Sequence, residues 1–238
     1  MLIGRRETPP HLETQYRQEG FWTDKLLTDY LEACVLKQPD KVAVLDETFG
    51  SLTYSQLGER SMRLALGLRE AGVGKGDFFI IQLPNWHQFS VIHLALTYLG
   101  AITVSVPVTF RQHEIQFIAR ATGAKGIAIP DEYQNHDFVE MVGNLQSELS
   151  NLKIGLVIGD HAPTGMLCYQ ESMSGPSVVT GSIKSFEESQ PHPDDVTFVV
   201  FTSGSTGEPK GVMHTSNTLA AINATYVKEY GVTSDDVI

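Results

Sequence analysis

Short apolar segments alternate with longer amphipathic segments along most of the chain. The apolar segments have the length of buried strands, which is the pattern of a parallel sheet; they cover residues 41–46, 78–83, 102–106, 127–129, 154–158 and 196–201. Between them, apolar positions recur at helical spacing over 57–68 and 138–149, which predicts helices that each pack one face on the core. We therefore predict an α/β fold with largely parallel sheets flanked by helices.

Local residues indicate where several of these elements begin and end. Thr53 is a plausible N-cap for a helix that Gly72 ends, and Asn85 can cap the next helix, which is expected to run to Leu99. The first 24 residues are polar and lack a clear period, so we expect an irregular segment there.

Residues 159–193 interrupt the alternation with a stretch rich in Gly, Pro, Ser and His. We therefore divide the chain into a first α/β subdomain (1–160), a linker or surface excursion (161–193) and the start of a second α/β unit (194–238). The sequence stops where another apolar strand would begin. Because natural ends usually lie in solvated segments, we expect it to be the N-terminal portion of a longer protein.

Charge and residue usage exclude several classes of protein. The 17 basic and 28 acidic residues give a net charge of −11, which argues against a nucleic-acid partner. The only two cysteines, Cys34 and Cys168, form no C-x-x-C pair, and the eight histidines show no metal-binding spacing. We therefore expect neither a disulfide framework nor a metal site.

No targeting or membrane segment is predicted. Arg5 and Arg6 are not followed by an apolar core, so the N-terminus does not resemble a signal peptide. The uncharged stretch 91–108 contains a glycine and a proline and is better explained as a buried helix followed by a strand than as a membrane span. A cytoplasmic protein is the default expectation, and the oligomeric state stays open.

The most specific chemistry follows the last complete apolar strand. Residues 202–211 read T-S-G-S-T-G-E-P-K-G and combine glycines, hydroxyls and one lysine. Glycines let main-chain N–H groups approach a ligand closely, and hydroxyls and a lysine add donors and positive charge, which together suit a polyphosphate. Parallel sheets bind ligands at the C-terminal ends of their strands. The predicted ligand-binding residues are Thr202, Ser203, Gly204, Ser205, Thr206, Gly207 and Lys210.

Other interpretations of this segment fit less well. A Walker A loop needs a glycine where Pro209 stands and a serine or threonine where Gly211 stands. The chain has no G-x-G-x-x-G dinucleotide motif and no G-x-S-x-G elbow, so neither a Rossmann site nor a serine hydrolase is supported. A plain flexible loop would not need this composition directly after a buried strand.

The pair Asp194–Asp195, which precedes the strand before this loop, is expected to be solvated.

The segment T-S-G-S-T-G-E-P-K-G resembles the phosphate-binding loop of the AMP-forming adenylating enzymes, which include acyl-CoA synthetases, adenylation domains of peptide synthetases and luciferases. Residues 52–57 resemble the family's early L-T-Y-x-E-L element, with Gln56 in place of the usual acid. Residues 96–107 resemble an element with a glycine and a proline-ended strand. The opening segment 16–22 is similar to that of the acid–CoA ligase and aryl-acid-activating branches.

The resemblance implies a two-step reaction. A small carboxylate, expected to be a fatty or cyclic acid, attacks the α-phosphate of ATP with Mg²⁺, and coenzyme A then takes the acyl group from the adenylate. Lys210 would act as a charge clamp on the phosphates. Ser216 stands where many relatives carry a histidine or aromatic residue of the acyl site, and we interpret His214 as a packed strand histidine.

The same resemblance leaves the activity of this chain open. The family's ribose-binding aspartate and C-terminal catalytic lysine are not found before Ile238, so we assign no catalytic residue within the chain. The alternatives are an inactive fragment, an ATP-phosphate-binding module, or an adenylating enzyme that loads a carrier protein instead of coenzyme A.

Overall fold

The computed structural model describes residues 8–174, 186, 188–202, 209–233 and 236. The helices are α1 (Pro10–Gln18), α2 (Leu27–Lys37), α3 (Tyr54–Glu70), α4 (His87–Tyr98), α5 (Gln112–Thr122), α6 (Phe138–Glu148), α7 (Tyr169–Ser172) and α8 (Ser216–Tyr230). The strands are β1 (Val42–Asp46), β2 (Gly50–Thr53), β3 (Phe78–Ile81), β4 (Ile102–Ser105), β5 (Gly126–Pro130), β6 (Glu132–Tyr133), β7 (His136–Asp137), β8 (Ile154–Ile158), β9 (Leu167–Cys168), β10 (Val196–Thr202) and β11 (Lys210–Thr215).

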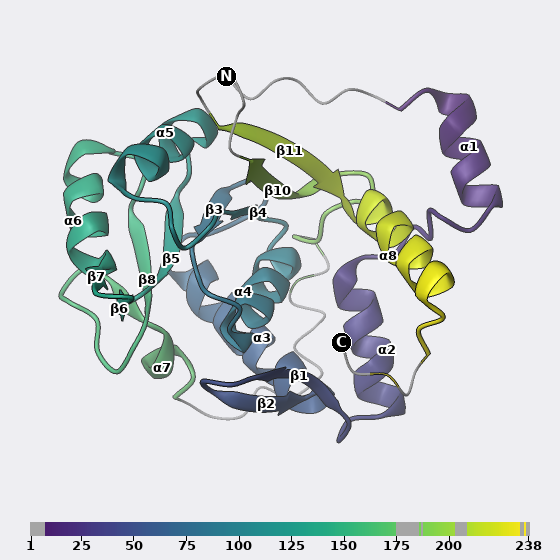
Figure 1. Ribbon diagram of the computed structural model, residues 1–238, viewed down its shortest axis with the longest axis horizontal. Coiled ribbons are helices and arrows are strands. Elements are labelled where there is room, and N and C mark those ends of the chain that lie inside the picture. The colour runs from purple at the N-terminus through teal and green to yellow at the C-terminus, as the bar shows by residue number, and fades with distance from the viewer. Residues whose placement is uncertain (1–7, 175–185, 187, 203–208, 234–235, 237–238) are drawn as a thin grey trace.

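A seven-stranded sheet forms the centre of the molecule, with the strand order β11-β10-β4-β3-β5-β8-β9. Every neighbouring pair in it is parallel except β10 and β11, which form an antiparallel hairpin at one edge. Helices lie on both faces of the sheet (Figure 1). The predicted α/β fold with a largely parallel sheet is confirmed. Strands β1 and β2 pair separately as a small antiparallel sheet.

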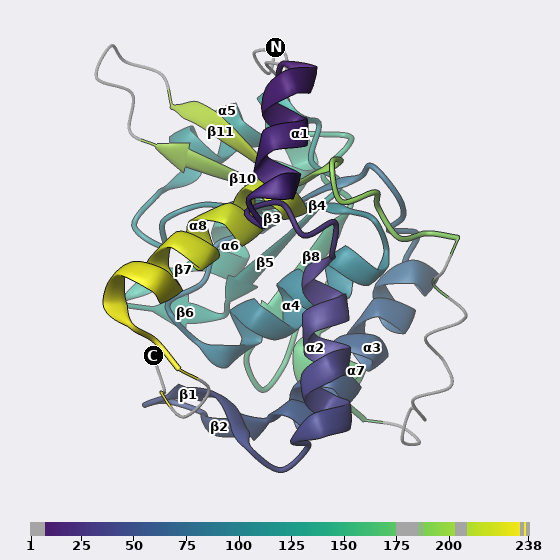
Figure 2. The ribbon, with the colours of Figure 1, turned by 90° about the vertical axis from the view of Figure 1, so that its right-hand side faces the viewer.

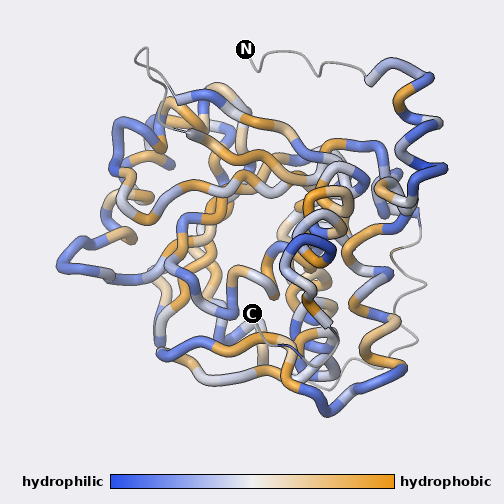
Figure 3. Tube along the Cα trace, turned by 45° about the vertical axis from the view of Figure 1, so that its right-hand side comes forward, coloured by the Kyte–Doolittle hydropathy of each residue, from blue (hydrophilic) through white to orange (hydrophobic). Residues whose placement is uncertain are grey.

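Two apolar clusters occupy the two faces of the sheet. Along β3, Phe79 and Ile81 belong to the cluster under α3 and α4, whereas Ile80 belongs to the cluster under α5 and α6. This alternation follows from the period of two along a strand. Apolar residues therefore concentrate in the central strands and the inner helix faces (Figure 3). The two predicted amphipathic helices, now α3 and α6, bury most of their predicted stripes: Leu57, Leu64, Ala65 and Leu68 on α3, and Phe138, Met141, Val142 and Leu145 on α6. Leu149, the last residue predicted for the second helix, is instead the half-buried C-cap of α6.

The order of the strands creates a topological switch point between β3 and β5. The chain leaves β3 through α4, which packs on one face of the sheet, and leaves β5 through α6, which packs on the other. The five strands β4-β3-β5-β8-β9 thus follow the doubly wound order 2-1-3-4-5. In such sheets a crevice opens at the carboxyl ends of the strands where the connections diverge.

Helix ends match the predictions only in part. Thr53 caps α3 as predicted, because its side chain accepts a hydrogen bond from the Gln56 amide. The prediction that Asn85 caps α4 is wrong. Instead, the carboxylate of Asp46 from the β1–β2 hairpin accepts the His87 amide at 2.8 Å. Burial raises the pKa of Asp46, but hydrogen bonds from this and neighbouring amides outweigh that effect and leave the pKa below its usual value.

The prediction of an irregular segment over residues 1–24 is also wrong, because α1 forms there. Arg17 at its end donates to Asp194 at 2.8 Å and pairs with Asp24. The buried Asn217 donates from its amide nitrogen to both of these carboxylates. Asp194 is therefore held in a network and is not simply solvated as expected. This network ties the N-terminal segment to the starts of β10 and α8.

The stretch predicted as a linker or surface excursion over 161–193 contains ordered elements. Strand β9 extends the sheet beside β8, and α7 follows it. Phe186 is fully buried and packs against Tyr98, with the Arg69 guanidinium above its ring. Strand β10 also lies in the same sheet as β4. The division of the chain at 160 and 193 stays a prediction.

The uncharged stretch 91–108 provides the buried part of α4 and strand β4, as predicted. Among the described residues, no helix is both long and apolar enough to cross a membrane.

Acid is expected to weaken the fold through one buried histidine of α4. His93 shares a hydrogen bond of 2.8 Å with Thr103 and packs against Phe198, and burial lowers its pKa from 6.5 to about 4. The unfolded chain therefore binds a proton as the pH falls below 6.5, whereas the folded chain does not until about pH 4. Between these values, stability should fall by up to roughly 3 kcal/mol, and it should be unaffected by this group above that window.

Urea unfolding near pH 7 and near pH 4.5 tests this expectation against His93→Asn, which keeps a donor at the same place but does not titrate. The variant should lose clearly less stability than the original chain on acidification. Equal losses in the two proteins would show that other groups cause the acid sensitivity.

Candidate functional site

The β10–β11 hairpin places two predicted ligand-binding residues opposite each other. Thr202 ends β10 and Lys210 begins β11, and they are paired in the ladder. The Thr202 hydroxyl donates to the main-chain oxygen of Lys210 at 3.4 Å. Both residues are exposed. The hairpin forms one edge of the sheet (Figure 2), so a hydroxyl and an ammonium group stand together at the carboxyl end of a parallel strand.

The other predicted loop residues, Ser203, Gly204, Ser205, Thr206 and Gly207, lie outside the described residues. Their role as phosphate ligands stays a prediction.

The residue after the lysine, Gly211, lies close to side chains of the neighbouring strand β10. A Cβ atom on Gly211 would lie 3.1 Å from both Phe201 and Val199. These contacts are tighter than ordinary van der Waals distances, so a side chain here would require the Phe201 and Val199 side chains to shift by a few tenths of an ångström. The glycine therefore keeps the two strands at the base of the loop in close contact.

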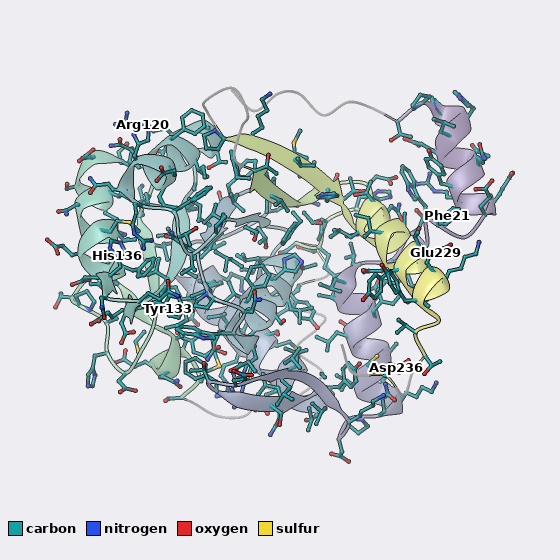
Figure 4. All side chains as sticks on the ribbon, viewed as in Figure 1. Phe21, Arg120, Tyr133, His136, Glu229 and Asp236 are labelled. Carbon is teal, nitrogen blue, oxygen red and sulfur yellow. The ribbon has the colours of Figure 1, made fainter. Side chains whose placement is uncertain are left out.

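A cavity of about 570 Å³ lies beside this hairpin, at the carboxyl ends of β3, β4 and β10. This volume is in the range of small-molecule sites. The cavity occupies the crevice at the switch point, because β3 and the segment after β5 both contribute to it. Its lining consists of Leu83, Pro84, Asn85, Phe89, Ser105, Val106, Pro107, Val108, Thr109, Tyr133, Val200 and Phe201. Tyr133 is labelled in Figure 4.

Part of the cavity lining lies on the same face of the sheet as Thr202 and Lys210. Val200 lines the cavity, and Thr202 is two residues further along the same strand, so both side chains leave β10 on the same side. Lys210 is the cross-strand partner of Thr202 and projects from that side as well. A ligand held by the lysine can therefore extend towards the cavity.

Sequence reasoning did not identify this cavity. Its walls come from four separate parts of the chain, and each part looks like an ordinary strand end. The usable signals were the prolines that follow two strands, Pro84 and Pro107, since a proline directly after a buried strand often marks a turn at a sheet edge.

Ser216, which the sequence aligned with an acyl-site position, and the strand residue His214 are both absent from the lining of this cavity. His214 is half-buried on β11, where its ladder partner is Phe198. Ser216 is the buried first residue of α8. Neither lines the cavity, so its walls come from other residues.

The described residues contain no group of three or more His, Cys, Asp or Glu side chains that could hold a metal ion. A metal in this region would need ligands supplied by a bound molecule or by other parts of the protein.

Comparison with known proteins identifies the family. Residues 31–238 match the model of the AMP-binding enzyme family. Over 223 residues the chain is 33% identical to the medium-chain fatty-acid–CoA ligase of Escherichia coli, and this match covers 93% of the chain and 38% of that protein. It is 30% identical to the 2,3-dihydroxybenzoate-AMP ligase of Bacillus subtilis, with 90% of the chain and 38% of that protein covered.

A solved structure agrees with these matches. The apo structure of MbtA from Mycobacterium smegmatis superimposes with a TM-score of 0.84 at 25% identity, and covers 98% of the chain and 42% of that structure. The chain thus spans about two fifths of the length of these relatives. Together, the family match, the parallel sheet and the hairpin with Thr202 and Lys210 lead to one assignment: the chain belongs to the family of AMP-binding enzymes.

Proposed function

We propose that this chain supplies the ATP-phosphate-binding part of an AMP-forming carboxylate–coenzyme A ligase. Membership of the family implies the use of ATP, and the proposal adds the acid and the acceptor. The observation that supports it is the pairing of Thr202 with Lys210 at the end of a parallel strand. In this proposal the enzyme first converts the acid to an acyl-adenylate with release of pyrophosphate, and then transfers the acyl group to the thiol.

Lys210 has the electrostatic task in the first step. Negative charge on the β- and γ-phosphates grows as the bond to the α-phosphate breaks. A preorganised ammonium group stabilises that charge more in the transition state than in the ground state. The Thr202 hydroxyl donates only a long hydrogen bond of 3.4 Å in the described structure, so it can turn to a phosphate oxygen at small cost.

The residues present fit ATP better than they fit a free metal ion. An ammonium and a hydroxyl are phosphate ligands, whereas the described residues offer no carboxylate cluster for Mg²⁺. Mg²⁺ commonly binds through substrate phosphates and few protein groups. We therefore propose that Mg²⁺ enters with ATP, held mainly by its phosphates, and neutralises part of their charge.

Exchange of labelled pyrophosphate into ATP tests the proposal in the complete protein that contains this sequence. A panel of straight-chain and aromatic acids should reveal at least one acid that makes exchange depend on its presence. Addition of coenzyme A should then yield an acyl thioester detectable by mass spectrometry. Exchange with no thioester would favour a carrier protein as the acceptor. If no acid supports exchange, the ligase assignment fails.

The alternative of a phosphate-binding module applies to the 238-residue chain by itself, because it spans only about two fifths of its relatives. Equilibrium binding of ATP to this chain, measured in parallel with exchange, separates the two. Binding without exchange in the complete protein would favour the module. A cytoplasmic location also stays a prediction.

A further inference from the structure

The hairpin that carries Thr202 and Lys210 is joined to the rest of the sheet over a short distance. Strand β10 pairs with β4 from Phe198 to Val200, and β11 is the edge strand. The end of β10 at Thr202 therefore extends beyond its last partner on β4. Before this contact, the register between β10 and β11 shifts between Val196 and Phe198, and irregularities of this kind bend a strand pair locally. The orientation of the hairpin thus depends on what holds its base.

A polar network holds that base on both of its strands. Asp194 precedes β10, and Asn217 lies in the first turn of α8, which follows β11 directly. The Asn217 amide nitrogen donates to Asp194 at 2.8 Å, and the Asn217 main-chain N–H donates to the Pro193 oxygen at 3.2 Å. Because Asn217 is fully buried, these bonds lie in a region of low dielectric and hold the two ends of the hairpin together.

The third part of the network comes from the N-terminal segment. Asp24 accepts from the Asn217 amide nitrogen at 2.8 Å, and the Asp24 main-chain N–H donates to the Asn217 side-chain oxygen at 2.9 Å. Arg17 joins the two carboxylates, because its Nε donates to Asp24 at 3.0 Å and its Nη2 donates to Asp194 at 2.8 Å. The hydrogen bonds from Arg17 and then from Asn217 lower the pKa of Asp24, as expected for a carboxylate held in its ionised form.

The guanidinium group of Arg17 is oriented by its own neighbours. It lies over the ring of the buried Trp22, at 5.0 Å from the ring centre. Glu13, one turn earlier on α1, lies 3.6 Å from Nη1 of the same group. Helix α1 itself buries none of its residues and lies apart from the helices that cover the sheet (Figure 1). What α1 and the residues after it add to the molecule is therefore mainly this bridge to the hairpin.

We propose that Arg17 is a positioning residue for the β10–β11 hairpin: it braces the base and so sets where Thr202 and Lys210 lie relative to bound ATP. Its effect on the reaction rests on the proposed function. A guanidinium suits this task because its planar fork bonds two carboxylates in fixed directions, which an ammonium group does not. Small displacements matter, since an error of about 1 Å in the position of reacting groups can cost about 100-fold in rate.

Hydrogen–deuterium exchange of the complete protein that contains this sequence tests the brace independently of activity. Arg17→Ala should speed exchange at the amides of β10 and β11 by about threefold or more, and should leave β8 unchanged. Lys125→Ala is the matched control. Lys125 pairs with Asp77 at 2.8 Å, the same distance as Arg17 to Asp194, and the side chains are 33% and 29% exposed against 31% and 23%. This control should leave the hairpin amides unchanged. Equal hairpin exchange in Arg17→Ala and the parent would overturn the brace.

Pyrophosphate exchange in the same protein tests the effect on the reaction. Arg17→Ala should lower kcat by about tenfold and change KM for the acid by less than about twofold. Arg17→Lys keeps the charge but not the fork, and should recover part of the loss. In a Lys210→Ala background, removal of Arg17 should cost less than about twofold, because the group that it positions is already absent. An equal loss in both backgrounds would show a general structural role and overturn the positioning role.

These measurements also separate this inference from the proposed function. Faster hydrogen exchange of the hairpin in Arg17→Ala, in a protein that no acid activates, would support the brace and refute the ligase assignment. Robust pyrophosphate exchange that Arg17→Ala leaves unchanged would refute the positioning role and leave the ligase assignment intact. Cooperative thermal melts establish that each variant is folded. If Arg17→Ala does not melt cooperatively, Arg17→Lys carries the same comparisons with smaller expected changes.

Discussion

Replacing Lys210 with alanine is expected to reduce acid-dependent pyrophosphate exchange by about 100-fold or more, because one preorganised charged donor on a developing phosphate charge has an effect of this size. The lysine begins β11 and is exposed, so its removal should leave the fold intact. The loss should appear in kcat and in kcat/KM for ATP, since the interaction strengthens as pyrophosphate departs.

Lys228→Ala provides the matched control for this measurement. Lys228 is also exposed but lies in the last turn of α8, away from the hairpin, and its loss should change the exchange rate by less than about twofold. Lys210→Arg keeps the charge but changes its shape, and should retain part of the activity. A near-normal kcat for Lys210→Ala would show that Lys210 does not stabilise the phosphate charge in the transition state.

Replacing Gly100 with alanine is expected to lower the free energy of unfolding by about 3–5 kcal/mol, from backbone strain and overpacking together. Gly100 follows α4 with a φ of +66°, and a Cβ atom there would lie 2.2 Å from the main-chain oxygen of Ser189. A main-chain atom cannot rotate away, so the segment that carries Ser189 would have to move. That segment is anchored by the buried Phe186 and by a bond from Lys75 to the Gln190 oxygen.

Gly67→Ala is the control for this substitution. Gly67 lies in the interior of α3, and a Cβ atom added to it would meet no neighbouring group within 4 Å. Alanine there should therefore raise stability by about 0.5–1 kcal/mol. Urea unfolding of both variants measures the difference. A loss below about 1 kcal/mol for Gly100→Ala would mean that the close approach of the two segments contributes little to the fold.

The elements that the sequence predicted well are those whose signal lies within a few residues. The central strands are short β-branched runs, and α3 and α6 show a clear apolar stripe, so local pattern and burial agree. Thr53 was correctly predicted as a cap because a cap and its partner are only three residues apart.

The errors arose where a distant residue supplies the partner. Asp46, and not the adjacent Asn85, satisfies the start of α4, since the β1–β2 hairpin brings its carboxylate there. Asp194 was expected to be solvated, but Arg17 reaches it from 177 residues away. Local sequence carries no information about such contacts.

In the candidate site, too, the features with a local sequence signal were predicted and those that depend on distant residues were not. The hairpin and its lysine follow from one contiguous motif, whereas the cavity is assembled from the ends of three strands and the segment that contains Tyr133. The strand order brings these ends together. That order depends on which strands pair with each other in the sheet. Strand pairing depends on long-range contacts throughout the sheet, so no single segment of the sequence reveals it.

The position of the hairpin also has a consequence for the order of folding. Strands β3, β4, β5 and β8 are joined by short helical crossovers, so they can assemble early with modest loss of chain entropy. Strand β10 instead pairs with β4, from which it is separated by a long stretch of chain. The β10–β11 hairpin would therefore dock last on a preformed sheet, and its detachment from that sheet would leave the remaining core assembled.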